Sequence, residues 1–232
     1  MNTKLLSALT ATAAATALFG ASAPAHAFSF GTSGISFSQD QDVKFNFTES
    51  HGAYISSLGI YTVKDSVASI AKTLFSETKS SDNGRANEWK GTLGNTVKDS
   101  GPVVFKFLAN QIYTLGLSST FGQWSGTVYS TSTLNSGASQ QAVFGGALLG
   151  NALDTKTTKA FKSAGDYTNG VGSLFSGTVI SFDDAGNGKD ADFQDFTVSA
   201  EAVPEPITMT GLALGFGGLV AARRRRASKT AS

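Results

Sequence analysis

The sequence contains no cysteine, which excludes disulfide bonds, thiolate metal sites and cysteine nucleophiles. Histidine is nearly absent as well, with only two residues in a chain of 232. A zinc site built on histidines or a Ser–His–Asp triad therefore has little material to use. His51 is the only histidine between the two terminal segments discussed below. Its position between two strand-like runs predicts an ordinary loop residue.

Charge is also sparse, since charged residues make up 15% of the chain and the formal net charge is +1. The positive excess comes from the two ends. Residues 28–203 contain twelve basic and sixteen acidic residues, a net charge of −4. A protein that binds a nucleic-acid backbone needs a basic face to neutralise the phosphates. We therefore expect no nucleic-acid partner.

The first 27 residues have the organisation of a secretory signal peptide. Lys4 forms a short basic region, residues 5–21 are apolar and small, and Ala25-His26-Ala27 fits the small-x-small rule for cleavage before Phe28. The alternative is a buried N-terminal helix. Cleavage at this point leaves residues 28–202 as the body, about the size of one domain and long enough to bury a continuous core.

The C-terminal segment, residues 203–232, combines a Pro-Glu-Pro triplet, an uncharged apolar run and four arginines. The run 207–222 has 16 residues and would span about 24 Å as a helix, slightly less than the ~30 Å hydrocarbon core of a bilayer. Local thinning of the bilayer accommodates such short spans. Arginines resist translocation, so this end is predicted to stay cytoplasmic and the body to lie outside. The pattern predicts a C-terminal transmembrane helix.

This tail resembles the PEP-CTERM sorting signal of bacterial surface proteins. The residues that carry the resemblance are Val203, Pro204, Glu205, Pro206, Arg223, Arg224, Arg225 and Arg226, with the glycine-bearing apolar run between them. The resemblance implies recognition by an exosortase at the cytoplasmic membrane, cleavage near the triplet, and transfer of the body to the cell surface or the extracellular matrix. Length and charge alone indicate only a C-terminal membrane anchor, which is the alternative.

The body shows a period-two pattern typical of β-strands. Val43, Phe45 and Phe47 share one face of the run VKFNFTE, and the runs PVVFKFL, YISSLGIYTV, QIYTLGL, GTVYSTS, QAVFGGALL, SLFSGTVISF and DFTVSA are similar in character. Glycine, serine, asparagine and aspartate separate them. We predict an all-β fold, an antiparallel two-sheet sandwich of jelly-roll type.

Two further predictions concern single segments. DSVASIAKTLFSET, residues 65–78, has apolar residues at helical spacing with Asp65 or Ser66 available as a cap, which predicts one short inserted helix; an irregular loop is the alternative. Trp124 and Tyr129 are predicted to lie in the core with the phenylalanines. The alternative is an exposed aromatic platform for sugar rings.

The most concentrated chemistry lies in ISFDDAGNGKDADFQDFTVS, residues 180–199. It carries five aspartates, namely Asp183, Asp184, Asp190, Asp192 and Asp195, opposed only by Lys189. Such close like charges repel. Calcium takes about six to eight oxygen ligands from carboxylates, amides and backbone, and glycines allow the tight path needed to wrap it. The segment predicts a calcium site, although the spacing is not that of an EF-hand. A solvated hairpin loop is the alternative.

The same segment resembles the closing motif of a family of bacterial surface domains of unknown function, often found ahead of PEP-CTERM tails. Phe182, Phe193 and the five aspartates fall on the motif positions, and SHGAYISSLGIY and VYSTSTLNSGASQQAVF resemble earlier strands of that family. Here Asn187 stands in the turn and one carboxylate of the family pattern is missing, so we expect the Asn187 carbonyl to act as a substitute ligand. The resemblance implies a β-sandwich with a calcium-type loop and no known enzymatic activity.

Three functions remain open at this point. The leading hypothesis is a non-enzymatic structural or adhesive module that binds calcium and matrix exopolysaccharide. The second is a carbohydrate-active enzyme, which needs two carboxylates about 5–9 Å apart across a cleft; Asp40, Asp42, Glu49 and Glu88 are the available acids, and no sequence feature pairs them. The third is a passive coat component without a ligand. We assign no catalytic residue and no organic cofactor.

Overall fold

The computed structural model describes residues 28–80, 91–98, 101–145, 174, 176–184, 193 and 195–204 of the chain. Several sequence predictions fall outside these residues, among them the signal peptide, the apolar run 207–222 and the arginines that follow it. Within the described part of the chain, no helix is long and apolar enough to cross a membrane.

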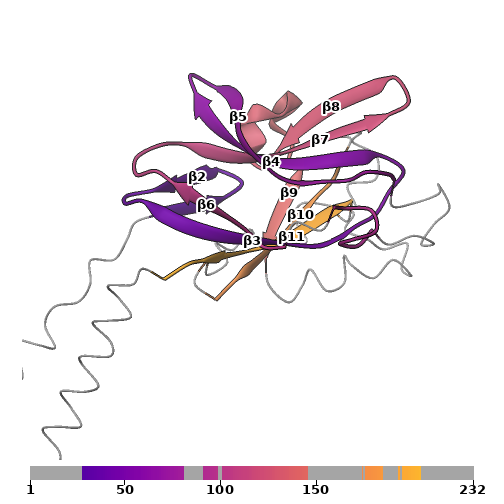
Figure 1. Cartoon of the computed structure of the whole chain (residues 1–232). Helices are drawn as coiled ribbons and strands as arrows, with labels where there is room; N and C mark the ends of the chain where they lie inside the picture. Colours follow the sequence, from indigo (N-terminus) through magenta and orange to yellow (C-terminus); the bar gives the residue numbers. More distant parts are fainter. Residues whose placement is uncertain are drawn as a thin grey trace, which may run out of the picture.

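Eleven β-strands and two single 3₁₀ turns make up the described structure (Figure 1). The strands are β1 (Phe28–Gly31), β2 (Gly34–Phe37), β3 (Gln41–Ser50), β4 (Ile55–Lys64), β5 (Val67–Ser76), β6 (Val103–Phe107), β7 (Tyr113–Phe121), β8 (Trp124–Tyr129), β9 (Ala142–Gly145), β10 (Thr178–Phe182) and β11 (Phe196–Ala202). The 3₁₀ turns η1 (Ser132–Leu134) and η2 (Ser136–Ala138) follow β8.

The strands form two antiparallel sheets that lie one over the other (Figure 1). Sheet A has the order β1-β2-β7-β4-β5, with β8 also paired to β7, and sheet B has the order β6-β3-β11-β10-β9. The all-β, two-sheet prediction is therefore confirmed. The last described strand, β11, lies between β3 and β10 in the middle of sheet B.

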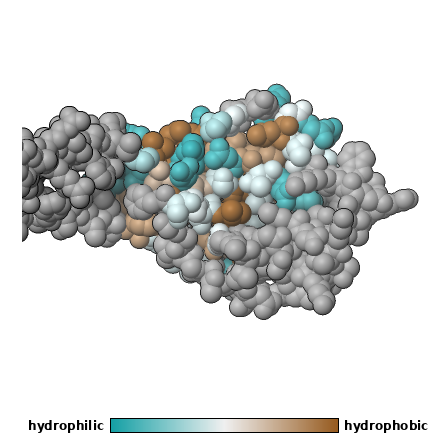
Figure 2. Space-filling model, turned by 90° about the horizontal axis from the view of Figure 1, so that it is seen from below, coloured by the Kyte–Doolittle hydropathy of each residue, from teal (hydrophilic) through white to brown (hydrophobic). Residues whose placement is uncertain are grey.

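The core lies between the sheets and is built largely from phenylalanine. Val43, Phe45 and Phe47 of β3 are buried, as the alternation predicts. Phe47 packs edge-on against Phe196 of β11 with ring centres 5.2 Å apart, and Phe37 reaches Phe107 at 5.3 Å. Aromatic side chains bury about 150–250 Å² each, so these rings supply much of the area removed from water. Seen from below, the described surface shows apolar residues interspersed among polar ones (Figure 2).

The predicted helix over residues 65–78 is wrong. The segment forms β5, which pairs with β4 over its whole length from Lys64↔Val67 to Ser57↔Ser76. Asp65 and Ser66 both have positive φ, of 50° and 61°, which is the geometry of a two-residue hairpin turn rather than of a helix cap. Since isolated short helices are marginal in water, the pairing available along the neighbouring strand decides the structure.

The prediction that Trp124 lies in the core is also wrong, because the side chain is 42% exposed. Tyr129 is half-buried and packs edge-on against Tyr61, with ring centres 5.4 Å apart. Burial, followed by repulsion from the Tyr61 side chain, raises the pKa of Tyr129 above its ordinary value.

Candidate metal centre

One end of sheet B gathers the ends of the acidic segment. The strands β10 and β11 pair along their length, and the last pair at this end is Phe182↔Phe196. Asp183 and Asp184 directly follow β10, and Asp195 directly precedes β11. Because the two strands are antiparallel partners, residues far apart in the acidic loop arrive at the same place. The pairing of the two predicted strands thus explains the clustering of these aspartates.

The three carboxylates lie close enough together to hold one ion. Asp183, Asp184 and Asp195 each offer one oxygen, and these atoms all lie within 4.8 Å of one another. Asp183 and Asp184 are only 3% and 4% exposed, and Asp195 is partly buried. Two ligands on opposite sides of a calcium ion are about 5 Å apart at most, since each bond is about 2.3–2.6 Å long. The spread of the cluster is compatible with a shared ion of that size.

Backbone hydrogen bonds hold the cluster in place. The amide of Asp195 donates to the Phe182 carbonyl at 3.1 Å, and the amide of Asp183 donates to the Gln141 carbonyl at 3.2 Å. The amide of Asp184 donates to Oδ2 of Asp195 at 2.9 Å, so one carboxylate oxygen of Asp195 already has a fixed partner across the loop. The site therefore rests on strand ends of sheet B.

The loop after β3 forms a wall of the site. The amide of His51 donates to the Asp195 carbonyl at 2.9 Å. Gly52 follows with φ of +102°, and a Cβ placed there would lie 3.1 Å from Oδ1 of Asp195 and 3.7 Å from Oδ2 of Asp184. A side chain at this position would meet both a strained backbone and the carboxylates. The absence of a Cβ at Gly52 gives these two aspartates their room.

The donor set consists of carboxylate oxygens. Three like charges at such short range repel, and burial adds a desolvation cost to each charged carboxylate. A divalent cation offsets both effects, and oxygen ligands suit a hard cation. This cluster of described residues could hold a metal ion.

Of the six residues predicted as metal ligands, the structure brings together Asp183, Asp184 and Asp195. Asn187, Asp190 and Asp192 lie outside the described residues. Val203 and Pro204 of the predicted sorting signal are described, and Glu205 and Pro206 are not.

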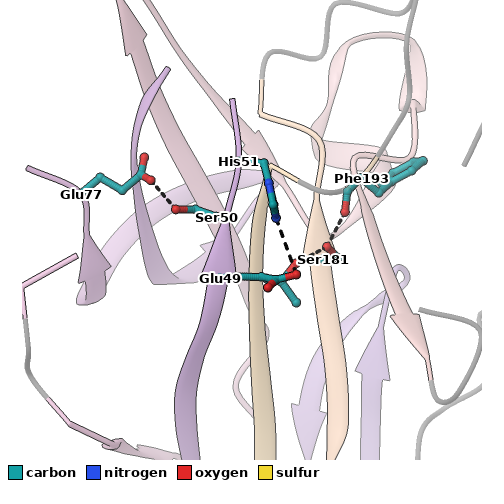
Figure 3. A network of polar contacts seen from close by, with 7 residues as sticks. Glu49, Ser50, His51, Glu77, Ser181 and Phe193 are labelled. Atoms are coloured by element: carbon teal, nitrogen blue, oxygen red, sulfur yellow. Dashed lines mark hydrogen bonds and ion pairs between the residues drawn. The ribbon is translucent and has the colours of Figure 1, made fainter. Parts of the chain in front are cut away.

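A buried polar network beside the cluster was missed at the level of sequence (Figure 3). His51 lies in the loop between β3 and β4, as predicted, but it is only 7% exposed, and its Nε2 lies 3.6 Å from Oε1 of the buried Glu49. Ser181 donates to the Phe193 carbonyl and lies 2.5 Å from the Thr197 hydroxyl. Glu49, Ser181 and Thr197 lie on β3, β10 and β11 of sheet B, whereas His51 directly follows β3.

The same network reaches the other sheet through Glu77. Its Oε1 accepts a hydrogen bond from the Ser50 hydroxyl at 2.5 Å, and its Oε2 accepts the Ser56 amide at 2.8 Å. Ser50 ends β3 of sheet B and Ser56 lies in β4 of sheet A. Glu77, which is 8% exposed, therefore fastens the two sheets together on either side of the loop that carries Gly52.

A register shift in β3 explains the position of Glu49. Phe47 pairs with Val198, but Glu49 pairs with the preceding Thr197, so Thr48 is an extra residue in the ladder. Such a bulge re-aims the residues that follow it. Uninterrupted alternation from Val43 would place Glu49 on the core face. The only sign of this register shift in the sequence is a glutamate at a position where the alternation predicts an apolar core residue.

Of the acids considered for a glycosidase, Asp42 and Glu49 do not form a pair in the described structure. Asp42 and Glu49 lie near opposite ends of β3, about 23 Å apart along the strand at ~3.3 Å per residue, against the ~5–9.5 Å that the reaction needs. Asp40 accepts the Ala109 amide at 2.9 Å near the Asp42 end. Glu88 lies outside the described residues.

Comparison of the chain with protein-family models, with curated proteins and with solved structures found no match.

Proposed function

We propose that this chain is an exported, non-enzymatic surface module whose β-sandwich body binds calcium at Asp183, Asp184 and Asp195. The observation that carries the proposal is the convergence of these three carboxylates, two of them buried, at the paired ends of β10 and β11. Calcium suits an all-oxygen ligand set of this spread, and extracellular calcium modules bind with Kd of about 10⁻⁴–10⁻³ M. The loop between Asp184 and Asp195 supplies further ligands in this proposal, from Asn187, Asp190 and Asp192.

Export is supported by the sequence at both ends of the chain. The signal-peptide pattern ends at Ala27, and the first described strand, β1, begins at Phe28. At the other end, the Val203 amide donates to the Asp42 carbonyl at 2.8 Å, and the next residue, Pro204, is exposed. A cut within the Pro-Glu-Pro triplet would therefore remove no hydrogen bond described for sheet B. This arrangement supports processing by an exosortase and a final location at the surface or in the matrix.

We further propose a jelly-roll-like topology and membership of the surface-domain family that the acidic motif resembles. The chain passes between the sheets repeatedly, from β3 to β4, from β5 to β6 and from β6 to β7, which supports the topology. Hairpins within one sheet, such as β4–β5 and β7–β8, are elaborations of it.

Calorimetric titration of the purified full-length chain with calcium chloride tests the site. We expect heat of binding with wild type, and loss of that heat in the variant Asp183→Asn with Asp195→Asn. Asp65→Asn is the matched control, because Asp65 is an exposed aspartate in the β4–β5 turn, remote in sequence from the acidic segment. Absence of calcium uptake by the wild-type chain, or equal uptake by the double variant, would overturn the proposed site.

Export is tested separately in cells that contain an exosortase. Replacing Arg223, Arg224, Arg225 and Arg226 by serine is expected to abolish processing at the triplet. Unchanged processing and delivery of this variant would contradict the sorting proposal and leave the calcium site unaffected.

A further inference from the structure

Two aromatic side chains stand exposed at the tip of the β7–β8 hairpin. Phe121 is 55% exposed and Trp124 is 42% exposed. Tyr54 joins them: its ring centre lies 5.2 Å from that of Phe121 and 5.2 Å from that of Trp124. We call Tyr54, Phe121 and Trp124 the aromatic cluster.

The cluster continues the inward-facing row of sheet A. Leu117 of β7 and Val128 of β8 are paired and buried, and Phe121 and Trp124 are the last pair of the same ladder, four residues further along each strand. Period two puts residues four apart on one face of a strand. The β7–β8 hairpin (Figure 1) thus continues the row, and its last aromatic pair is exposed to solvent.

The side chains of the cluster have fixed positions. A Cβ placed on Gly126 would lie 2.7 Å from both Cη2 and Cζ2 of Trp124, so the indole lies across the strand over this glycine. Tyr54 meets the indole edge-on at 83°. Packing on two sides preorganises the indole, and preorganisation reduces the entropy lost on binding a ligand.

The segments that carry the cluster are uncharged. No charged residue occurs between Lys106 and Asp154, or between His51 and Lys64, the two segments that form this surface. Thr120, Ser125 and Thr127 are exposed on the opposite face of the same hairpin, since they alternate along the strands with the row that ends in Phe121 and Trp124. Proteins bind anionic membrane surfaces and nucleic acids through basic residues, and both segments lack basic residues. The surface therefore favours a neutral partner.

The size of the exposed cluster argues against a second copy of the chain as that partner. Aromatic side chains have about 150–250 Å² each; Phe121 and Trp124 are about half exposed and Tyr54 is partly exposed, so the cluster offers roughly 200–300 Å². A stable protein interface needs about 800 Å² from each partner. An area of this size matches one or two sugar rings, whose C–H faces pack on aromatic rings.

We propose that the aromatic cluster binds neutral pyranose units of a polysaccharide. This inference takes its extracellular setting from the proposed function and does not need the calcium site. Trp124 and Phe121 supply the apolar contact, and Tyr54 limits the ring from one side.

Affinity electrophoresis of the purified full-length chain tests the inference, with hydroxyethylcellulose, xylan, galactomannan and dextran as four neutral polysaccharide probes. We expect retardation by at least one probe in the presence of EDTA, and about tenfold weaker retardation for Trp124→Ala and for Phe121→Ala. Val104→Ala is the control, since Val104 is a 54% exposed apolar residue on β6 of the other sheet. Thermal melting shows whether each variant is folded, and exposed positions are expected to change it little.

Each remaining outcome overturns the inference. Migration unaffected by all four probes excludes neutral glycan binding at this surface. Retardation that Trp124→Ala and Phe121→Ala leave unchanged places any sugar site elsewhere. Concentration-dependent dimerisation that Trp124→Ala abolishes identifies the cluster as a contact between copies of the chain. Since all gels contain EDTA, a failed calcium titration and a failed glycan assay are independent results.

Discussion

Replacing Gly52 by alanine tests whether the loop after β3 bounds the proposed metal site. The residue has φ of +102°, a conformation that side chains rarely adopt, and the added methyl would lie 3.1 Å from Oδ1 of Asp195. Backbone strain of this kind costs about 1–3 kcal/mol. For a body of this size, 1 kcal/mol corresponds to about 2–4 °C in Tm. Without calcium, we therefore expect Gly52→Ala to lower Tm by about 2–12 °C.

The effect on calcium is the sharper part of the prediction. At a calcium concentration about 100 times Kd, an ion bound only by the folded chain stabilises it by about 2.7 kcal/mol, or ~5–11 °C in Tm. If displacement of Asp195 weakens binding about tenfold, the stabilisation at the same concentration falls to ~1.4 kcal/mol, or ~3–6 °C. The measurement is differential scanning calorimetry in EDTA and in calcium.

Gly177 provides the control for this prediction. It also has positive φ, of +83°, but an added Cβ would have no atom within 4 Å, and it precedes β10 at the end opposite Asp183. Gly177→Ala is expected to lower Tm while keeping the full calcium increment. Equal calcium increments in the two alanine variants would refute the reasoning that Gly52 makes room for the carboxylates.

Three further predictions concern the fold around the site. Glu77→Gln removes the charge that accepts two buried hydrogen bonds and is expected to lower the free energy of unfolding, measured by urea titration, by about 1.5–3 kcal/mol. Glu201→Gln, in an exposed ion pair, is the control and should lower the free energy of unfolding by less than about 1 kcal/mol. Ser66→Gly, at φ of 61°, should raise Tm if the β4–β5 turn is a hairpin and lower it if the segment is helical. Because the pKa of Tyr129 is raised in the folded chain, its stabilising contribution is complete below the unfolded pKa of about 10 and is lost as pH rises through the folded value. Tyr129→Phe should therefore reduce the fall of Tm with rising pH in alkaline buffer. An unchanged slope of Tm against pH would contradict this prediction.

Much of the fold could be predicted because strand alternation is a local property. Val43, Phe45 and Phe47 identify one buried face by their spacing alone, and the two strands that flank the acidic loop were found in the same way. The convergence of Asp183 and Asp195 then follows from antiparallel pairing. The clustering of these two aspartates can therefore be predicted from the sequence once the two flanking strands are recognised.

The failures concern interactions that spacing does not encode. The segment that forms β5 mixes alanine with β-branched residues and satisfies both a helical and an extended pattern, so its pairing with β4 decides the outcome. Trp124 has the phase of a core residue, but periodicity does not show how far the opposite sheet extends. The burial of His51 and Glu49 depends on the bulge at Thr48, which is a feature of the ladder with β11.

Strand β3 runs from the place where the chain leaves sheet B to the candidate metal site. Its first residues lie beside Val203, where the chain leaves sheet B, and its last residue is followed by the loop that contacts Asp195 and Asp184. Ten residues of strand extend about 33 Å. If the body is tethered to the cell through its C-terminus, the end that carries the acidic and aromatic residues is the end farther from the point of attachment.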